Sequence, residues 1–225
     1  MTAGPELREL RTSSGGNGSN PLAALRRFTR EREPAERCEL CSAPLAPHPR
    51  HEHLLDPAAR ALACACTPCA LLFPPEAEKR YRRVSRRLFW LEDFTLSDAQ
   101  WEALALPVGM AFLHTSSPSA EVHAYYPSPA GATESLLTLE GWGELVSANP
   151  VLERMAPDVE ALLVNRVRGA RDHFLAPIDR CYELVGLIRL RWRGLSGGTE
   201  MWAAVDAFFA DLRDHATTRR ASGDA

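Results

Sequence analysis

Lysine is almost absent from this sequence, since Lys79 is the only lysine among 26 basic residues. All the others are arginine, and alanine and proline are abundant. This bias is typical of a protein encoded by a GC-rich genome. A cluster of arginines in such a chain therefore does not by itself indicate a function.

Long apolar runs are also missing. No stretch approaches the roughly 20 apolar residues that cross a bilayer, so we expect no membrane span. The first eight residues contain no basic segment followed by an apolar core, so we expect no secretory signal. Closely spaced thiols without an export signal fit a reducing compartment, which predicts a cytoplasmic protein.

Neither sign of charge is in large excess. A net charge of −3 and a pI near 6.2 give no general reason to expect nucleic acid or an anionic membrane as a partner. The sequence contains no phosphate-binding loop, dinucleotide fingerprint or nucleophile elbow. With 225 residues, 45% of them hydrophobic, it has the composition of an ordinary globular protein.

Cysteine is scarce but concentrated in one segment. Four of the six cysteines form two Cys-x-x-Cys pairs, Cys38 with Cys41 and Cys66 with Cys69. Each pair presents two thiolates from a tight turn, and two pairs can surround one ion tetrahedrally. The residues between the pairs have the length of a hairpin. The sequence therefore predicts a metal site formed by these four thiolates, with zinc as the expected ion.

Iron is the alternative ion at these cysteines. A rubredoxin-type site or an iron–sulfur cluster uses the same pairs, and the protein would then be a small electron carrier. Rubredoxin knuckles usually carry glycine after the second cysteine, but Ser42 and Ala70 stand there. Burial of the cysteines for packing, or disulfide pairing, is a further interpretation that the doubled spacing disfavours.

A fifth cysteine and three histidines lie close to the two pairs in the sequence. Cys64 precedes Cys66 by two residues, so on a strand the two side chains would share a face. Cys64 is therefore a spare thiol, an alternative ligand or a small buried residue. His48, His51 and His53 lie in the hairpin, either as neighbours of the metal ligands or as surface residues.

We expect an α+β protein with two folded parts. Residues 1–20 are predicted to be a disordered tail, because their glycines, serines and asparagines bury little surface. Residues 21–75 are predicted to form a short helix and a small zinc-ribbon-like module, which packs on a larger mixed α+β domain over 76–215. Residues 216–225 are expected to be a polar tail. Helices and strands mix without strict alternation, which favours α+β.

Capping signals and periodicity predict the elements. We expect helices over 76–87, over 98–104 with a Ser97/Gln100 capping box, over 142–148, and from Thr199, with Thr199 as its cap. We expect strands over 60–66, 109–115, 121–126, 135–139, 159–167 and 181–192.

The only basic cluster is the arginine-rich segment 79–87. Beside a zinc ribbon, such a segment can bind nucleic acid, which makes a nucleic-acid-binding regulator one alternative function. The interpretation that we favour is the solvated face of a helix, with Tyr81, Val84 and Leu88 on its buried side. The acidic net charge makes nucleic acid the less favoured partner.

No catalytic constellation is evident in the larger part. A Cys181 thiol activated by His173 is conceivable, but a buried cysteine is the simpler expectation. His114, His123 and His173 are expected not to converge. We therefore predict no catalytic residues and rank a thiol-dependent enzyme last.

Five motifs together are distinctive. They are Cys-Glu-Leu-Cys (38–41), His-x-His-Leu-Leu-Asp (51–56), Cys-Ala-Cys-x-x-Cys-Ala-Leu-Leu-Phe (64–73), Cys-Tyr-Glu-Leu-Val-Gly (181–186) and Trp-Arg-Gly-Leu-Ser-Gly-Gly (192–198). On these residues, over about 37–212, the chain resembles an uncharacterised bacterial family whose genes are often found near nickel–iron hydrogenase genes. The resemblance implies no established activity, but it does imply an accessory, maturation or electron-transfer role beside a hydrogenase.

Taken together, these observations predict a metal-binding accessory or interaction protein with a protein partner. The resemblance alone implies that this partner is related to hydrogenase. The ligands would be Cys38, Cys41, Cys66 and Cys69, with Cys64 as the alternative ligand. An electron carrier and a nucleic-acid-binding regulator are the alternative functions.

Overall fold

A computed structural model describes residues 36–222 of the chain, except 48–49, 75–79 and 136–140. The predicted N-terminal tail, the predicted short helix after Asn20 and His48 lie outside the described residues. Within the part of the chain that is described, no helix is both long enough and apolar enough to cross a membrane.

The cysteine-rich segment forms a small three-stranded sheet with the order β2-β1-β3. Strands β1 (Glu52–Asp56) and β2 (Ala61–Ala65) form an antiparallel hairpin, and the two-residue β3 (Arg82–Arg83) pairs with the other edge of β1. A single helical turn, α2 (Thr67–Ala70), follows β2. This agrees with the strand predicted over 60–66.

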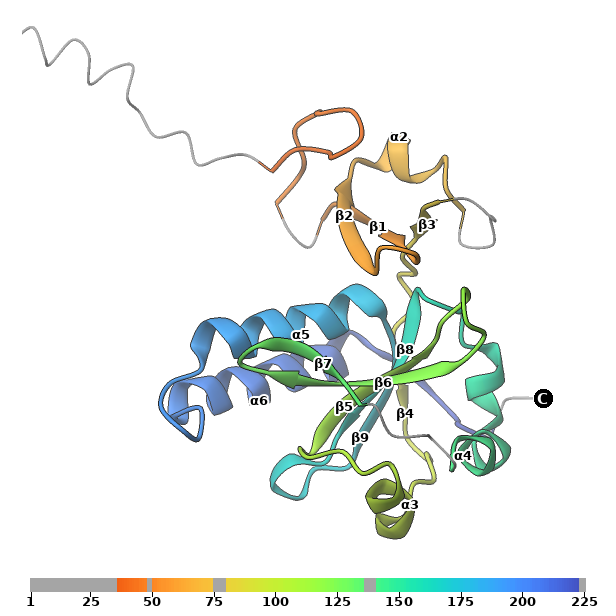
Figure 1. Cartoon of the computed structure of the whole chain (residues 1–225), viewed down its shortest axis with the longest axis vertical. Helices are drawn as coiled ribbons and strands as arrows, with labels where there is room; N and C mark the ends of the chain where they lie inside the picture. The colour runs from red at the N-terminus through yellow and green to blue at the C-terminus, as the bar shows by residue number, and fades with distance from the viewer. Residues whose placement is uncertain (1–35, 48–49, 75–79, 136–140, 223–225) are drawn as a thin grey trace, which may run out of the picture. The chain divides into compact units, whose positions relative to one another are not determined.

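A seven-stranded mixed sheet forms the larger part, with the order β10-β4-β9-β8-β5-β6-β7 (Figure 1). All neighbours are antiparallel except β10 and β4. The strands are β4 (Phe89–Leu91), β5 (Met110–Thr115), β6 (Val122–Ser128), β7 (Gly131–Glu134), β8 (Glu160–Asn165), β9 (Asp172–Pro177) and β10 (Thr217–Arg219). The helices are α3 (Asp98–Ala103), α4 (Trp142–Ala148), α5 (Ile178–Arg191) and α6 (Thr199–His215), with 3₁₀ turns η1 (Pro150–Arg154) and η2 (Val167–Gly169).

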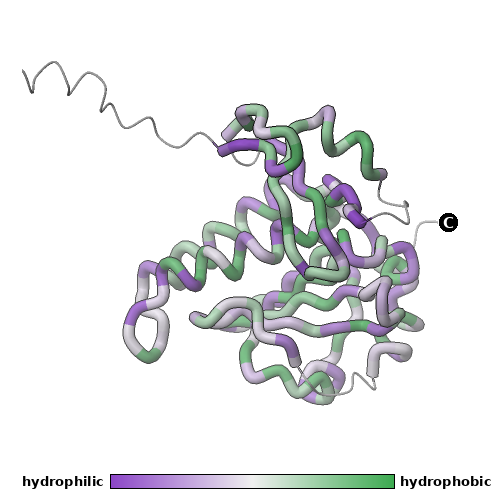
Figure 2. The backbone as a smooth tube through the Cα atoms, turned by 45° about the horizontal axis from the view of Figure 1, so that its top comes forward, coloured by the Kyte–Doolittle hydropathy of each residue, from purple (hydrophilic) through white to green (hydrophobic). Residues whose placement is uncertain are grey.

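Side chains alternate between the two faces of the sheet, and both faces of the central strands β8 and β9 are buried. Phe112 and Phe174 pack in one core with buried residues of α5 and α6, whereas Leu113 and Leu175 pack in a second core with residues of α4 and η1. Figure 2 shows hydrophobic and hydrophilic segments alternating along the backbone of the helices and strands. The fold is α+β, as the sequence predicted.

Several predicted elements are confirmed. The Ser97/Gln100 capping box is present at the start of α3, with both reciprocal hydrogen bonds formed. Helix α4 covers the residues predicted for it, and β5, β6 and β8 lie within or close to their predicted ranges. These segments have a strong local signal, either a cap or a run of β-branched and apolar residues between turns.

The strand predicted over 181–192 is wrong, because this segment is the greater part of α5. Its buried residues Ile178, Cys181, Leu184, Val185 and Ile188 recur every three or four positions, which is the period of a helix. In this part of the chain, the strand that belongs to the sheet is the preceding one, β9. In a short apolar segment, too few helical turns are present for the hydrophobic period to distinguish a helix from a strand.

Two further predictions need correction, and a third lies almost wholly outside the described residues. The helix predicted over 76–87 is not formed over its described residues 80–87, which include β3. Of the strand predicted over 135–139, only Ser135 is described, and it follows the end of β7 at Glu134. Helix α6 has Gly198 at its cap position, with φ of 79°, and Thr199 is the first helical residue without a capping side-chain hydrogen bond.

His173 on β9 is buried, and no acidic side chain among the described residues forms an ion pair with it. Its ring stacks on Phe94 with centroids 4.6 Å apart, and its Nε2 has no hydrogen-bond partner among the described residues. Burial, assisted by the charges of Arg166 and Arg171, lowers the pKa of His173 to about 4. The folded protein therefore holds this ring neutral well below the pH at which an exposed histidine is protonated.

We predict that His173 makes the fold acid-sensitive. The unfolded chain takes up a proton near pH 6.5 and the folded chain only near pH 4, so stability is complete above pH 6.5 and falls as the pH drops through this window. The loss should approach about 3 kcal/mol below pH 4. The measurement is the free energy of unfolding in urea at pH 7.5 and pH 4.5. The loss of stability at the lower pH should be absent in His173→Leu and present in the exposed control His215→Leu. Equal pH dependence in both variants would contradict the prediction.

Candidate metal centre

Four cysteine sulfurs converge at the end of the small sheet. The Sγ atoms of Cys38, Cys41, Cys66 and Cys69 all lie within 4.8 Å of one another. The sulfurs of Cys41 and Cys66 are 3.6 Å apart, too far for a disulfide, whose S–S bond is about 2.05 Å. Ligands about 2.3 Å from a tetrahedral zinc ion are separated by roughly 3.8 Å. The four thiols are therefore spaced as such an ion requires.

The first Cys-x-x-Cys pair lies on a tight turn. The amide of Cys38 donates to the carbonyl of Ala43 at 2.8 Å, and the amide of Ser42 donates to the carbonyl of Cys38 at 2.7 Å. Ser42 has φ of 62°, in the left-handed region where glycine is the residue with least strain. Serine thus takes the conformation that glycine takes in many metal knuckles.

The second pair lies on a helical turn. Cys66 precedes α2 as its cap residue, and Pro68 occupies the first turn, where its missing N–H costs nothing. The amide of Ala70 donates to the carbonyl of Cys66 at 2.9 Å. Residues three apart on a helical turn share a face, so Cys66 and Cys69 point the same way.

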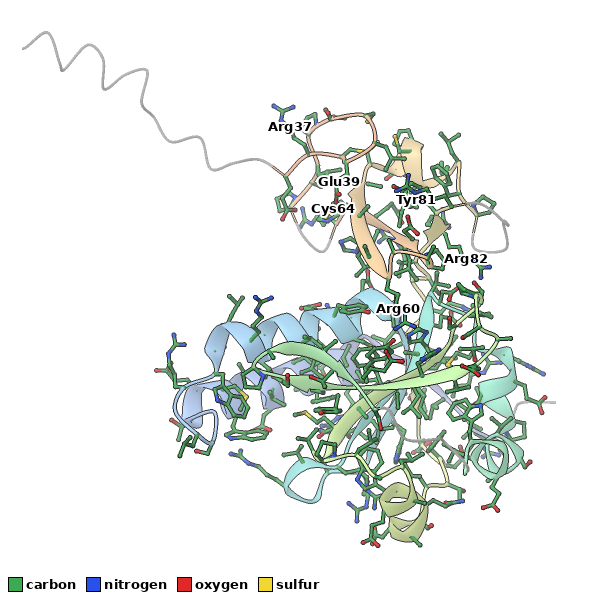
Figure 3. The ribbon with its side chains drawn as sticks, in the orientation of Figure 1. Arg37, Glu39, Arg60, Cys64, Tyr81 and Arg82 are labelled. Carbon is green, nitrogen blue, oxygen red and sulfur yellow. The ribbon has the colours of Figure 1, made fainter. Side chains whose placement is uncertain are left out.

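Glu39 attaches the first turn to the hairpin. Its carboxylate accepts a hydrogen bond from the Cys64 amide at 2.7 Å, and its own amide donates to the Cys64 carbonyl at 3.0 Å. Figure 3 shows Glu39 and Cys64 next to one another in the small sheet. This contact fixes the position of the first cysteine pair relative to the second, although Glu39 and Cys64 are 25 residues apart in the sequence.

The thiols differ in their ease of ionisation. Burial raises the pKa of Cys38, but backbone N–H groups of Cys66, Cys41 and Leu40 outweigh it and lower the pKa to about 6. Hydrogen bonding with the sulfurs of Cys41 and Cys66 raises the pKa of Cys69 to about 12. One thiolate forms readily here, and further thiolates need a cation to offset their mutual repulsion.

Cys64 lies outside this group of four sulfurs. It is instead grouped with His51 and His53, one ligand atom of each lying within 4.8 Å of the others. Burial, with the charges of Glu36 and Glu39, raises the pKa of the Cys64 thiol. The histidine pair was noticed in the sequence, but its position beside Cys64 depends on the register of β1 and β2, which pairs His53 with Cys64.

The basic segment is occupied by ion pairs. Arg87 makes a two-pronged contact with the fully buried carboxylate of Glu160, at 2.7 and 2.8 Å. Arg82 pairs with the buried Asp158 at 3.1 Å. Arg80 and Arg86 pair with Asp56 and Glu52, respectively. These arginines neutralise carboxylates along an extended segment and do not form the face of a helix.

Cys181 is fully buried in α5, where it belongs to the larger core. Burial raises the pKa of its thiol far above the ordinary range. His173 belongs to the opposite face of the sheet, so the two side chains do not form a catalytic pair. The predicted burial of Cys181 is confirmed.

A polar network that the sequence analysis missed joins the hairpin to β6 and β7. Arg60 donates to the hydroxyl of Tyr125 at 3.1 Å and pairs with Glu134 at 2.8 Å (Figure 3). His123 contacts the same carboxylate at 2.5 Å and lies beside His114, with ring centroids 6.3 Å apart. The expectation that the histidines stay apart is thus wrong for this pair, which the cross-strand register brings together.

The comparisons with known proteins give a family and nothing more specific. A family described as a family of unknown function (DUF5947) matches residues 37–216, which is most of the chain and all of the cysteine-rich segment. No curated protein matches the chain, and no solved structure matches it. The match names no activity, metal or partner. The chain therefore belongs to DUF5947, a family of unknown function.

Proposed function

We propose that this protein holds a structural zinc ion through Cys38, Cys41, Cys66 and Cys69, and that it acts as an accessory or interaction protein. The observation that carries the proposal is the convergence of four thiols within 4.8 Å. A set of four thiolates fills a tetrahedral ion completely and leaves no position for a substrate, which is typical of structural zinc.

The small core around the site supports a structural role for the metal. Among the described residues, its buried members are Cys38, Leu54, Ala65 and Ala70, and Leu45, Phe73 and Tyr81 pack against them while partly exposed. Three of the four buried residues are no larger than cysteine, so the core buries little apolar surface. In a zinc-ribbon-like module of this kind, metal binding supplies much of the folding free energy.

Iron at the same cysteines would make the protein an electron carrier. The helical conformation after Cys66 and the alanine that follows Cys69 favour zinc over a rubredoxin site, whose two knuckles are usually alike and glycine-bearing. The visible absorption spectrum of protein purified without oxygen separates the two, because a zinc–thiolate site is colourless.

An exposed apolar surface at the two knuckles supports a protein partner. Leu40 lies within the first turn and is 38% exposed, while Leu71 and Leu72 follow Cys69 and are 63% and 62% exposed. Figure 2 shows the hydrophobic segment that contains Leu71 and Leu72. We propose that a cytoplasmic protein docks here, and the family resemblance suggests a component of hydrogenase assembly as this partner.

The buried position of Cys181 and the paired arginines favour this role over the other candidates. A thiol enzyme needs an exposed, ionisable cysteine beside a base. A nucleic-acid-binding regulator needs arginines that reach phosphates, whereas Arg80, Arg82, Arg86 and Arg87 contact carboxylates.

We predict that Cys66→Ser lowers the zinc content by one ion per chain, because it removes one of the four converging thiolates. The control Cys181→Ser should retain the wild-type zinc content, since that thiol is buried away from the site. Elemental analysis and X-ray absorption at the zinc edge measure the content and the number of sulfur ligands. Unchanged zinc in Cys66→Ser would contradict the proposal.

We predict that removing the metal loosens the small sheet and leaves the large one intact. Hydrogen exchange after treatment with a strong chelator should increase over β1, β2 and α2, because their core is small. The central strands β8 and β9, which are buried along their whole length, should keep their protection. A uniform rise over both sheets, or no change in the small one, would be the contrary result.

We predict that the double variant Leu71→Glu/Leu72→Glu loses its protein partner. A tagged chain should recover nickel–iron hydrogenase subunits or their assembly factors from the native host, and the variant should recover less than one tenth as much. The matched control is Leu190→Glu, which changes a leucine 77% exposed on α5. Equal recovery by all three chains would contradict docking at the knuckles.

A further inference from the structure

A second group of metal-binding side chains lies on the other face of the small sheet. His51, His53 and Cys64 each offer a ligand atom within 4.8 Å of the other two. His53 and Cys64 are direct cross-strand partners on β1 and β2. His51 precedes β1 by one residue and shares the face of His53, with ring centroids 4.7 Å apart. Two imidazoles and a thiol are thus brought together by strand pairing.

Both histidines are oriented through Nδ1. The Nδ1 of His51 lies 3.0 Å from the carbonyl oxygen of Ala46, an atom that can only accept. The Nδ1 of His53 lies 2.7 Å from the carboxylate of Asp179. Each contact places the proton on Nδ1 and so leaves the lone pair of the ring on Nε2. Metal-binding histidines in proteins are commonly held in this way by a carbonyl or carboxylate.

The carboxylate behind His53 comes from the larger part of the fold. Asp179 lies in the first turn of α5, and its Oδ1 also accepts a hydrogen bond from the amide of Arg180 at 2.8 Å. The contact between His53 and Asp179 spans 126 residues of sequence. A histidine held this firmly between a strand and a helix is preorganised to bind a metal.

The charges around the group favour a cation. Glu36 lies 3.5 Å from the Nδ1 of His51, and Asp179 lies behind His53. The nearby arginines each pair with carboxylates. Arg86 contacts Glu52 at 3.0 Å and also donates to the carbonyl of His51 at 3.3 Å, and Arg180 contacts Glu183 and Asp211 at 2.7 and 2.6 Å. These carboxylates offset the charge of the arginines, so the arginines do not leave an uncompensated positive charge beside the histidines.

From this arrangement we infer a second metal site, separate from the four cysteines, in which His51, His53 and Cys64 bind a zinc-class transition metal ion. Two imidazoles and one thiolate suit zinc and its neighbours among the first-row metals. Three protein ligands leave one position for water or an exchangeable ligand, as in reactive zinc sites and unlike the closed site of four thiolates. His51 and His53 also line a pocket of about 350 Å³ with Arg86 and Asp179, large enough for a small ligand beside the ion.

Metal titration of the full chain tests this site. Wild-type protein should bind two Zn²⁺ ions, and Cys64→Ser and His53→Ala should each bind one. The matched control His123→Ala, which removes a histidine that is also held by a carboxylate, should bind two. Substitution with Co²⁺ adds a signature, because the ion lost in Cys64→Ser has one sulfur ligand and the ion that stays has four.

A further variant separates metal binding from folding. Asp179→Asn keeps the hydrogen-bonding shape but removes the charge behind His53, so we expect two sites with the second weakened about 10- to 100-fold. The cobalt–thiolate absorption of the four-cysteine site should not change. If Cys64→Ser loses this absorption, the variant has unfolded. The second site is then judged from the metal affinity of Asp179→Asn.

Two results would overturn the inference. One is a wild-type chain that binds a single ion, with Cys64→Ser and His53→Ala indistinguishable from it. The other is a second ion whose affinity is the same in wild type and Asp179→Asn, and which survives in His53→Ala. Both results leave the four-cysteine proposal standing, because that proposal is judged by Cys66→Ser.

Discussion

The constraint on which our proposal for the small sheet depends is the convergence of four thiols. Four sulfurs within 4.8 Å of one another repel as thiolates, and the fully buried residues described beside them are one leucine, two alanines and Cys38, with Leu45, Phe73 and Tyr81 partly buried against them. A bound cation of charge two or more would remove the repulsion and close the loop between the two pairs. The residues that surround the sulfurs, from the strained Ser42 to the Glu39 contact, serve to bring the thiols to this spacing.

Hydrogen bonds and ion pairs connect this sheet, and the arginine segment that follows it, to the larger part of the fold. His53 contacts Asp179 at the start of α5, Arg60 contacts Tyr125 and Glu134, and Arg87 contacts the buried Glu160. Buried charges are costly unless they are paired and hydrogen-bonded, and breaking such a pair is more damaging than never having formed it. Substitutions at these junction residues are therefore expected to weaken the attachment of the small sheet to the larger part.

The two candidate sites differ in what they can do. The four-cysteine site is closed and can stabilise structure, whereas the group of His51, His53 and Cys64 has only three donors and adjoins a pocket. The separation is small in sequence, since Cys64 and Cys66 are two residues apart. One face of the hairpin thus carries Leu54 and Ala65 toward the thiolates, and the other carries His53 and Cys64 toward Asp179.

The four-cysteine group, the α+β class and the capping box of α3 were readable from the sequence alone, because a ligand spacing or a capping box is a local property. Other features were decided by tertiary structure. The segment 181–192 has an apolar composition that fits a strand or a helix, and only packing against the sheet selects α5. The arginines of 80–87 have a helical composition, but the carboxylates of distant residues hold them extended. Asp179 meets His53 across 126 residues, and Cys64 meets His53 through strand register. A sequence specifies which donors exist within one turn or strand, whereas contacts between distant segments depend on the fold as a whole.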